Sequence, residues 1–188
     1  MPDDNVIRNL EAQAKQKRQH ATFFTWHDRS AKGKGVAEAG IVNDLLTAME
    51  AEQRRDYRNL GPSGDQWPDV WLQDSTGRQV PCEVAELVDQ AALPAGDARP
   101  EVLAELAERL QEILERKGMR SLGGRSGQQS VLVIHSDEFY LNADNVASVL
   151  STTRFKKPST IQRAFLVLSY DPTRGGYRYF ELQLGGMP

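Results

Sequence analysis

The stretch WPDVWLQDSTGRQVPCEVAELVD, residues 67–89, contains two short apolar segments on either side of a turn. The tetrapeptide DSTG at 74–77 suits a type I turn, with aspartate first and glycine where the backbone enters the left-handed region. A three-residue loop closed by a glycine is a common hairpin connection, so we predict a β-hairpin. Acidic side chains are depleted in strands, yet Asp69, Glu83 and Glu86 lie within or beside these two segments.

The loop length fixes the register of this predicted hairpin. It pairs Val70 with Cys82 so that apolar residues share one face. One step further it places Asp69 opposite Glu83, with Cβ atoms about 5 Å apart. Like charges facing each other destabilise a strand pair, whereas Mg²⁺ is bound by one or two carboxylates together with waters and phosphate oxygens. The hairpin therefore predicts a magnesium or manganese site.

A helix before the hairpin adds a third acid. Val42, Leu45, Leu46 and Met49 have the i, i+3, i+4, i+7 spacing of a buried helical face. Extending that face back by one turn reaches Glu38, an unexpected acid on the side facing the core. Two interpretations stay open, a carboxylate directed at the metal site and a carboxylate stabilised by the helix dipole in the first turn.

The rest of the chain predicts further helices and strands. Apolar periodicity and end signals indicate helices at 100–118 and 142–151, two buried strands at 130–137 and 164–172, and an alternating strand at 177–184. The expected fold is α/β, more loosely α+β, with a central mixed sheet of about five strands flanked by helices.

The remaining segments complete a single predicted domain, 1–188. Residues 1–31 read as a polar helical lead-in to a core at 32–188. Within that core, 32–35 reads as a glycine-broken link, and 51–66 as a basic helix end followed by a loop.

Composition, cysteine content and net charge limit the classes of protein to which this chain can belong. The 188 residues are 39% hydrophobic and 26% charged, which fits a globular domain. No apolar run reaches the roughly 18 residues of a membrane span, and the N-terminus lacks the order of a secretory signal. The single Cys82 excludes an internal disulfide, so a cytoplasmic protein is the default expectation. The net charge of −3 requires any nucleic-acid binding to use a local basic face.

The order helix–strand–strand–helix–strand, with Pro68-Asp69 in one hairpin strand, Glu83-Val84-Ala85 in the next and Glu38 on the preceding helix, resembles the PD-(D/E)xK restriction-endonuclease-like nuclease superfamily. The resemblance covers roughly residues 30–170. It implies a magnesium-dependent nuclease that cuts phosphodiester bonds of DNA. It also implies that Asp69 and Glu83 are metal ligands, and that Glu38 is a further ligand or a water-positioning group.

One departure from the family pattern leaves two functional hypotheses open. The motif lysine, two residues after the second acid, is replaced by Ala85, while Glu86 points to the opposite face. Lys34, one turn before Glu38, is a candidate substitute. The leading hypothesis is a metal-dependent nuclease acting on DNA. The alternative is a non-cleaving module on the same fold that binds nucleic acid or a protein partner. The sequence leaves the oligomeric state open, a homodimer included.

Other candidate residues favour structural roles. His135 and Asp137 end a buried strand, where a turn residue bonded to backbone is the commoner outcome. Cys82 occupies an apolar strand position and reads as a small core residue. The runs Arg54-Arg55 and 154–157 (RFKK) are candidates for phosphate contacts, although such runs are more often solvated.

Overall fold

The computed structural model describes residues 31–64, 67–87, 101–122, 128–138, 141–171 and 176–185. The helical lead-in predicted for residues 1–31 thus lies outside the described residues, except for its last position. No helix in the described ranges is long and apolar enough to cross a membrane.

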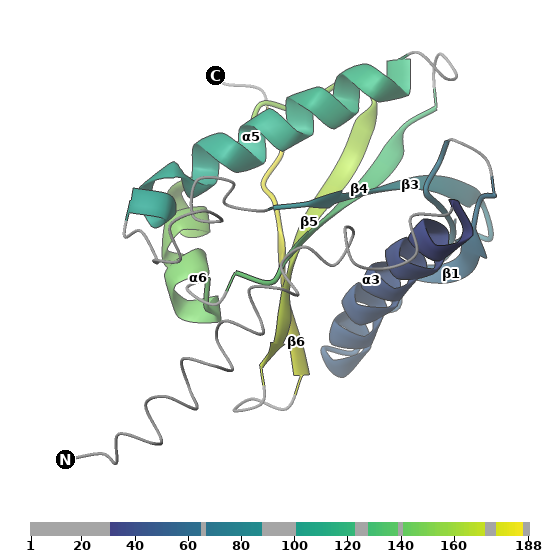
Figure 1. Ribbon diagram of the computed structural model, residues 1–188, viewed down its shortest axis with the longest axis horizontal. Coiled ribbons are helices and arrows are strands. Elements are labelled where there is room, and N and C mark those ends of the chain that lie inside the picture. The colour runs from purple at the N-terminus through teal and green to yellow at the C-terminus, as the bar shows by residue number, and fades with distance from the viewer. Residues whose placement is uncertain are drawn as a thin grey trace.

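A curled mixed sheet forms the centre of the fold (Figure 1). Its six strands in the described ranges lie in chain order. They are β1 (Tyr57–Pro62), β2 (Val70–Asp74), β3 (Gln79–Glu86), β4 (Ser130–Ser136), β5 (Ile161–Asp171) and β6 (Gly176–Glu181). The β1–β2, β2–β3 and β5–β6 pairs are antiparallel, whereas β3–β4 and β4–β5 are parallel. The prediction of a mixed sheet flanked by helices is therefore confirmed.

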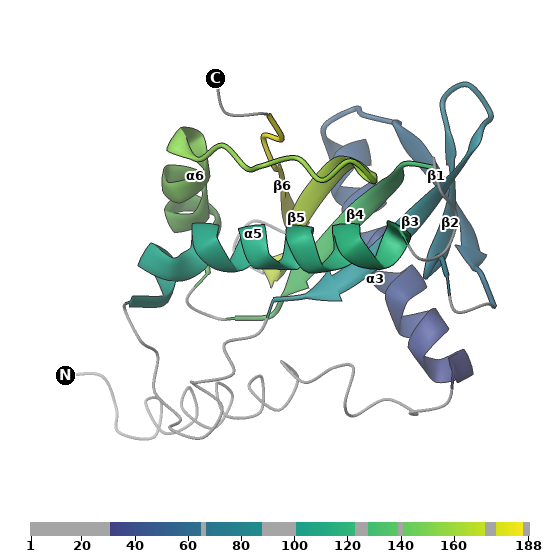
Figure 2. The same cartoon turned by 90° about the horizontal axis from the view of Figure 1, so that it is seen from above.

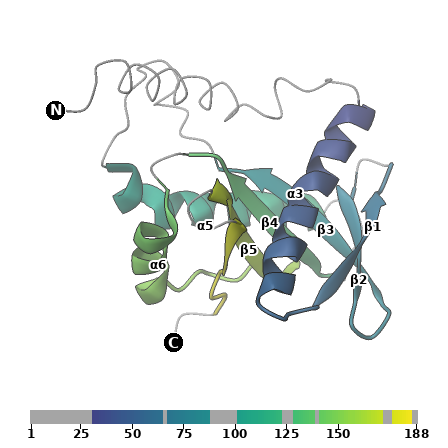
Figure 3. The same ribbon diagram turned by 90° about the horizontal axis from the view of Figure 1, so that it is seen from below.

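Helices cover both faces of the sheet, as opposite views show (Figures 2 and 3). Helix α3 (Ala31–Ala51) packs on one face, and α5 (Glu101–Leu122) and α6 (Ala143–Thr152) pack on the other. Each face has its own buried apolar cluster. Because side chains alternate along a strand, Val84 of β3 contributes to the α3 cluster while Ala85 contributes to the α5 cluster.

The hairpin has the predicted register. Val70 pairs with Cys82, and the Gly77 N–H donates to the Asp74 carbonyl at 3.0 Å. Gly77 has φ +86°, which is the left-handed conformation that the turn requires. Cys82 is fully buried, and burial raises the pKa of its thiol well above the usual range. It is a core residue, as expected.

Two predictions of secondary structure were wrong. Strand β1 occupies part of 51–66, the segment expected to be a helix end and a loop, so the expected strand number was one short. Its residues alternate between half-buried and exposed, and β1 is an edge strand, where its Gly61 and Pro62 are tolerated. The link predicted at 32–35 lies inside α3. There a Cβ on Gly35 would meet the Pro62 Cβ at 3.1 Å, so glycine lets α3 approach β1 closely.

Candidate functional site

Asp69 and Glu83 lie at the open end of the hairpin, next to each other. Asp69 immediately precedes β2, and its Oδ2 accepts a hydrogen bond from the Val84 N–H at 2.8 Å. Glu83 belongs to β3, is 5% exposed, and points to the side of the sheet that α5 covers, as Ala85 does. The hairpin therefore brings the two acids together, as the register predicted.

A lysine that sequence reasoning missed lies between these two acids. Lys117 of α5 is 8% exposed. Its Nζ donates to Glu83 Oε2 at 2.7 Å and to Asp69 Oδ2 at 3.2 Å. The expected repulsion between two facing carboxylates is therefore replaced by a shared ion pair with a single ammonium group.

Helix α3, on the face of the sheet opposite α5, adds a second pair of charged residues. Glu38 is 5% exposed, and its Oε1 lies 3.1 Å from the Nζ of Lys34, which in turn lies 3.8 Å from Asp69 Oδ1. Because α3 begins at Ala31, Glu38 is not in its first turn, and the dipole interpretation of this acid was wrong. We call Glu38, Asp69, Glu83, Lys34 and Lys117 the charged cluster.

Burial and mutual repulsion set the electrostatics of the charged cluster. Burial raises the pKa of Glu83 above its ordinary value, with the Lys117 ammonium opposing the rise. Burial and the Asp69 charge likewise raise the pKa of Glu38, against the effect of Lys34. Burial tends to lower the pKa of Lys34, but the neighbouring carboxylates outweigh it and raise that pKa. With three acids and two lysines, the cluster retains a formal negative charge that favours an added cation.

Lys117 gives the charged cluster a cation although position 85, where the resemblance implies a lysine, is an alanine. Ala85 is 6% exposed and packs in the apolar cluster beneath α5, so a lysine there would have to displace core side chains. The cation comes instead from α5. One signal in the sequence could have identified Lys117 as a buried residue. It lies seven residues after the fully buried Leu110 and therefore continues the apolar stripe of α5. Lys34, the substitute proposed from the sequence, pairs with Glu38 and Asp69 on the side of α3.

A metal ion has to be considered against the donors that are present. Within the described ranges, no group of three or more histidine, cysteine or carboxylate side chains converges closely enough to hold a metal. Mg²⁺ does not require three such ligands, because it keeps several waters and takes one or two carboxylates. Asp69 Oδ2 and Glu83 Oε2 both lie within hydrogen-bond reach of one nitrogen, so these two hard oxygen donors are near neighbours and fit such an ion.

A second polar group lies on the opposite face of β3. Glu86 pairs in register with His135 of β4, and the Nε2 of His135 lies 3.2 Å from Asp137 Oδ1. His135 and Asp137 therefore contact each other, whereas the expectation that such a turn pair bonds to backbone stays a prediction. In the part of the chain that the structure describes, Glu86 Oε1 and His135 Nδ1 are buried without a hydrogen-bond partner.

We expect Glu86→Gln to stabilise the protein at alkaline pH. Burial raises the pKa of Glu86 to about 7, with His135 opposing and Asp137 and Glu138 adding to the rise. Since the folded state binds this proton more tightly than the unfolded state, the contribution of Glu86 to stability falls as pH rises through that value. Glutamine carries no charge, so the variant should gain about 1–2 kcal/mol over the native chain at about pH 8, after allowance for solvent screening.

Urea unfolding of both proteins at an acidic and an alkaline pH measures this difference. The two free energies of unfolding should approach each other below about pH 4, where Glu86 is protonated in both the folded and the unfolded state. A gap that is independent of pH would contradict the assignment of this titration to Glu86.

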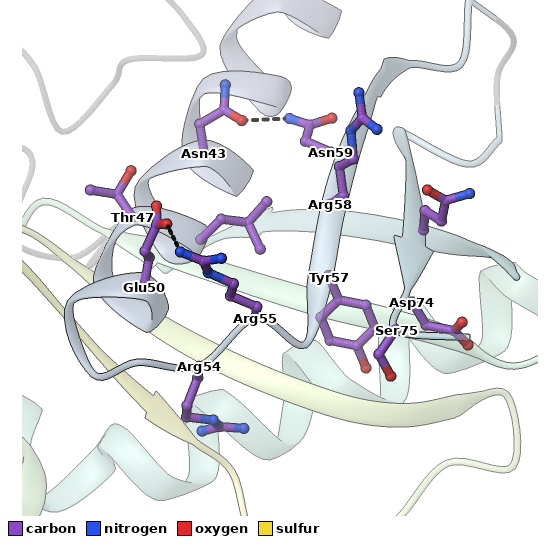
Figure 4. A pocket seen from close by; sticks show the side chains of 12 residues that line it. Asn43, Thr47, Glu50, Arg54, Arg55, Tyr57, Arg58, Asn59, Asp74 and Ser75 are labelled. Atoms are coloured by element: carbon purple, nitrogen blue, oxygen red, sulfur yellow. Dashed lines mark hydrogen bonds and ion pairs between the residues drawn. The ribbon is translucent and has the colours of Figure 1, made fainter. Parts of the chain in front are cut away.

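The Arg54-Arg55 run follows the end of α3 and lines a groove between that end, β1 and the hairpin turn (Figure 4). Arg55 pairs with Glu50 at 3.2 Å, and Arg54 pairs with Asp56 and donates to the Tyr179 hydroxyl at 3.1 Å. Both arginines are thus paired with carboxylates, and Arg58 is a third arginine that lines this groove.

Comparison of the chain with protein-family models, with curated proteins and with solved structures finds no match. The geometry of the charged cluster is therefore the basis for a functional proposal.

Proposed function

We propose that the protein is a metal-dependent nuclease of the PD-(D/E)xK type that hydrolyses phosphodiester bonds of DNA. The observation that carries the proposal is the Lys117 ammonium held between Asp69 and Glu83. Two acids and a lysine at the open end of a hairpin are the residue types that the superfamily resemblance implies. Here the lysine comes from α5 and not from the strand.

Each member of the charged cluster has a chemical task in this proposal. A bound Mg²⁺ would lower the pKa of a water and withdraw charge from a phosphoryl oxygen, and Asp69 and Glu83 would hold it. Lys117 provides a positive charge beside the scissile phosphate, where negative charge develops in the transition state. Glu38, whose pKa is raised, is suited to accept a proton from a water that it orients.

Lys34 is the member of the charged cluster best placed to meet substrate. Its side chain is 60% exposed, whereas those of Glu38 and Lys117 are 6% and 11% exposed. A flexible ammonium of this kind can leave Glu38 and contact a phosphate oxygen as a point charge. Lys34 thus acts in binding, and Lys117 acts at the reacting phosphate.

The rival function is a non-cleaving module that binds nucleic acid or a protein partner. It is favoured by the ion pairs within the charged cluster, because Lys34 and Lys117 neutralise most of its negative charge without a metal. In that case the cluster would serve stability alone, and a divalent ion would bring no activity.

Cleavage of plasmid, linear duplex and single-stranded DNA, each with Mg²⁺, Mn²⁺ or EDTA, tests the proposal. We expect cleavage with the divalent ions, none with EDTA, and a loss of at least about 100-fold in Glu83→Gln, since even changes to residues that only hydrogen-bond a metal ligand cost about 10–100-fold. Glu86→Gln is the matched control on the same strand and should keep full activity. Absence of cleavage on every substrate with both metals would support the rival.

A further inference from the structure

The segment between α6 and β5 presents three exposed basic side chains, those of Arg154, Lys156 and Lys157. We call these three residues the basic ridge. The segment runs alongside α5 (Figure 2). Phe155, in the middle of the run, is 2% exposed and packs in the apolar cluster beneath α5. The RFKK run is therefore not a uniformly solvated stretch, because a core aromatic side chain anchors it.

Backbone hydrogen bonds hold this segment on both sides of Phe155. The Phe155 N–H donates to the Gln183 carbonyl at 3.0 Å, and the Gly185 N–H donates to the Phe155 carbonyl at 3.1 Å. The Gln111 side chain of α5 accepts from the Lys156 N–H at 2.9 Å and donates to the Lys156 carbonyl at 3.3 Å. The basic side chains thus extend from a fixed backbone, which lowers the entropy cost of ordering them on a ligand.

The charges of the basic ridge are not neutralised within the described part of the chain. There, Lys156 and Lys157 make no ion pair, and the Arg154 guanidinium donates only to the neighbouring Thr153 carbonyl at 3.4 Å. Arg54 and Arg163, by contrast, are both paired with carboxylates. On a chain with net charge −3, the ridge is a local concentration of available positive charge, which suits a polyanion.

The end of α5 connects the basic ridge to the charged cluster. Gly118, the residue after Lys117, packs against Pro158, where an added Cβ would meet the proline Cβ at 2.6 Å. The Thr160 hydroxyl donates to the Gly118 carbonyl at 2.9 Å. Because β5 is two strands away from β3, and the ridge precedes β5, the two strands lie about 10 Å apart across the sheet. This separation spans a few phosphates of a DNA strand.

We propose that the basic ridge binds the phosphate backbone of duplex DNA and holds it in line with the charged cluster. This inference rests on the proposed function and names the surface by which that site holds its substrate. Phosphate contacts of this kind position a protein on DNA without reading its sequence. Gln111 and Lys117 both belong to α5. The same helix therefore fixes the backbone of the basic ridge and the position of the ammonium in the charged cluster.

Fluorescence anisotropy with a labelled DNA duplex in EDTA tests the inference without cleavage. The double substitution Lys156→Gln with Lys157→Gln should weaken binding roughly 10-fold. It should also make the slope of log K against log salt less negative by about 1.8, because each phosphate that a lysine neutralises contributes about 0.9 to that slope. Arg55→Gln is the matched control, because Arg55 is exposed but paired with Glu50, away from the ridge. It should change neither the affinity nor the slope.

The outcomes separate this inference from the proposed function. A reduced slope in the ridge variant supports the ridge, whether or not the native chain cleaves DNA. In a cleaving protein the ridge variant should raise KM and leave kcat unchanged. An unchanged affinity and slope in the ridge variant, no binding of duplex DNA by the native chain, or tighter binding of duplex RNA than of duplex DNA would each overturn the inference.

Discussion

Replacing Lys117 with methionine should lower the free energy of unfolding by about 3–5 kcal/mol, the usual cost of removing one partner from a buried ion pair. Methionine has a similar length and no charge, so Asp69 and Glu83 would face each other in a buried site without a cation. DNA cleavage should also be lost, because the positive charge beside the scissile phosphate is gone. Urea unfolding in EDTA measures the first effect, and a cleavage assay on the folded variant measures the second.

A thermodynamic cycle identifies the origin of this loss. Adding Asp69→Asn and Glu83→Gln to the methionine variant removes the two uncompensated carboxylates, so the triple variant should recover most of the lost stability. Divalent ions should stabilise Lys117→Met more than the native chain, since in that variant the ion binds carboxylates that no ammonium compensates. A cost below about 1 kcal/mol for Lys117→Met, the range of an exposed pair, would contradict this account of the charged cluster.

Asp69→Asn should abolish cleavage and weaken divalent-ion binding by about 100-fold or more, and leave the fold intact. The expected loss exceeds the roughly 10–100-fold that follows when a partner of a metal ligand is removed. The Val84 N–H, which donates to Asp69 Oδ2, can donate to the amide oxygen of asparagine instead, so the end of the hairpin keeps its closing hydrogen bond. The substitution removes only the charge that Lys117 and Lys34 both contact.

Asp69→Ala is the informative comparison, because it also leaves the Val84 N–H without its partner. It should match Asp69→Asn in activity but cost a further ~1–3 kcal/mol of stability. Thermal melts and cleavage rates of both variants measure the two effects. Full activity in Asp69→Asn would exclude Asp69 as a metal ligand.

The hairpin was predictable because its determinants are local. The DSTG turn sets the loop length, the loop length sets the register, and the register places Asp69 beside Glu83. The helical face through Val42 and Met49 was equally local, and it located Glu38 on the correct side of α3.

The errors arose where tertiary contacts overrode local signals. Gly33 and Gly35 suggested a break, but the contact between α3 and Pro62 favours a helix with glycine at the interface. Strand β1 is half exposed and contains glycine and proline, so it lacks an apolar pattern. Lys117 lies 34 residues from Glu83 in the chain. Only the packing of α5 on the sheet brings them together, so the motif lysine was sought near Ala85 and Lys34.

The most direct test of the central claim, that Asp69 and Glu83 form a divalent-ion site, is Mn²⁺ binding followed by electron paramagnetic resonance. The native chain should bind an ion that Mg²⁺ displaces, and Glu83→Gln should lose it. Glu86→Gln should bind as the native chain does, since Glu86 is on the opposite face of the same strand. Absence of Mn²⁺ binding to the native chain, or equal binding by Glu83→Gln, would contradict the claim.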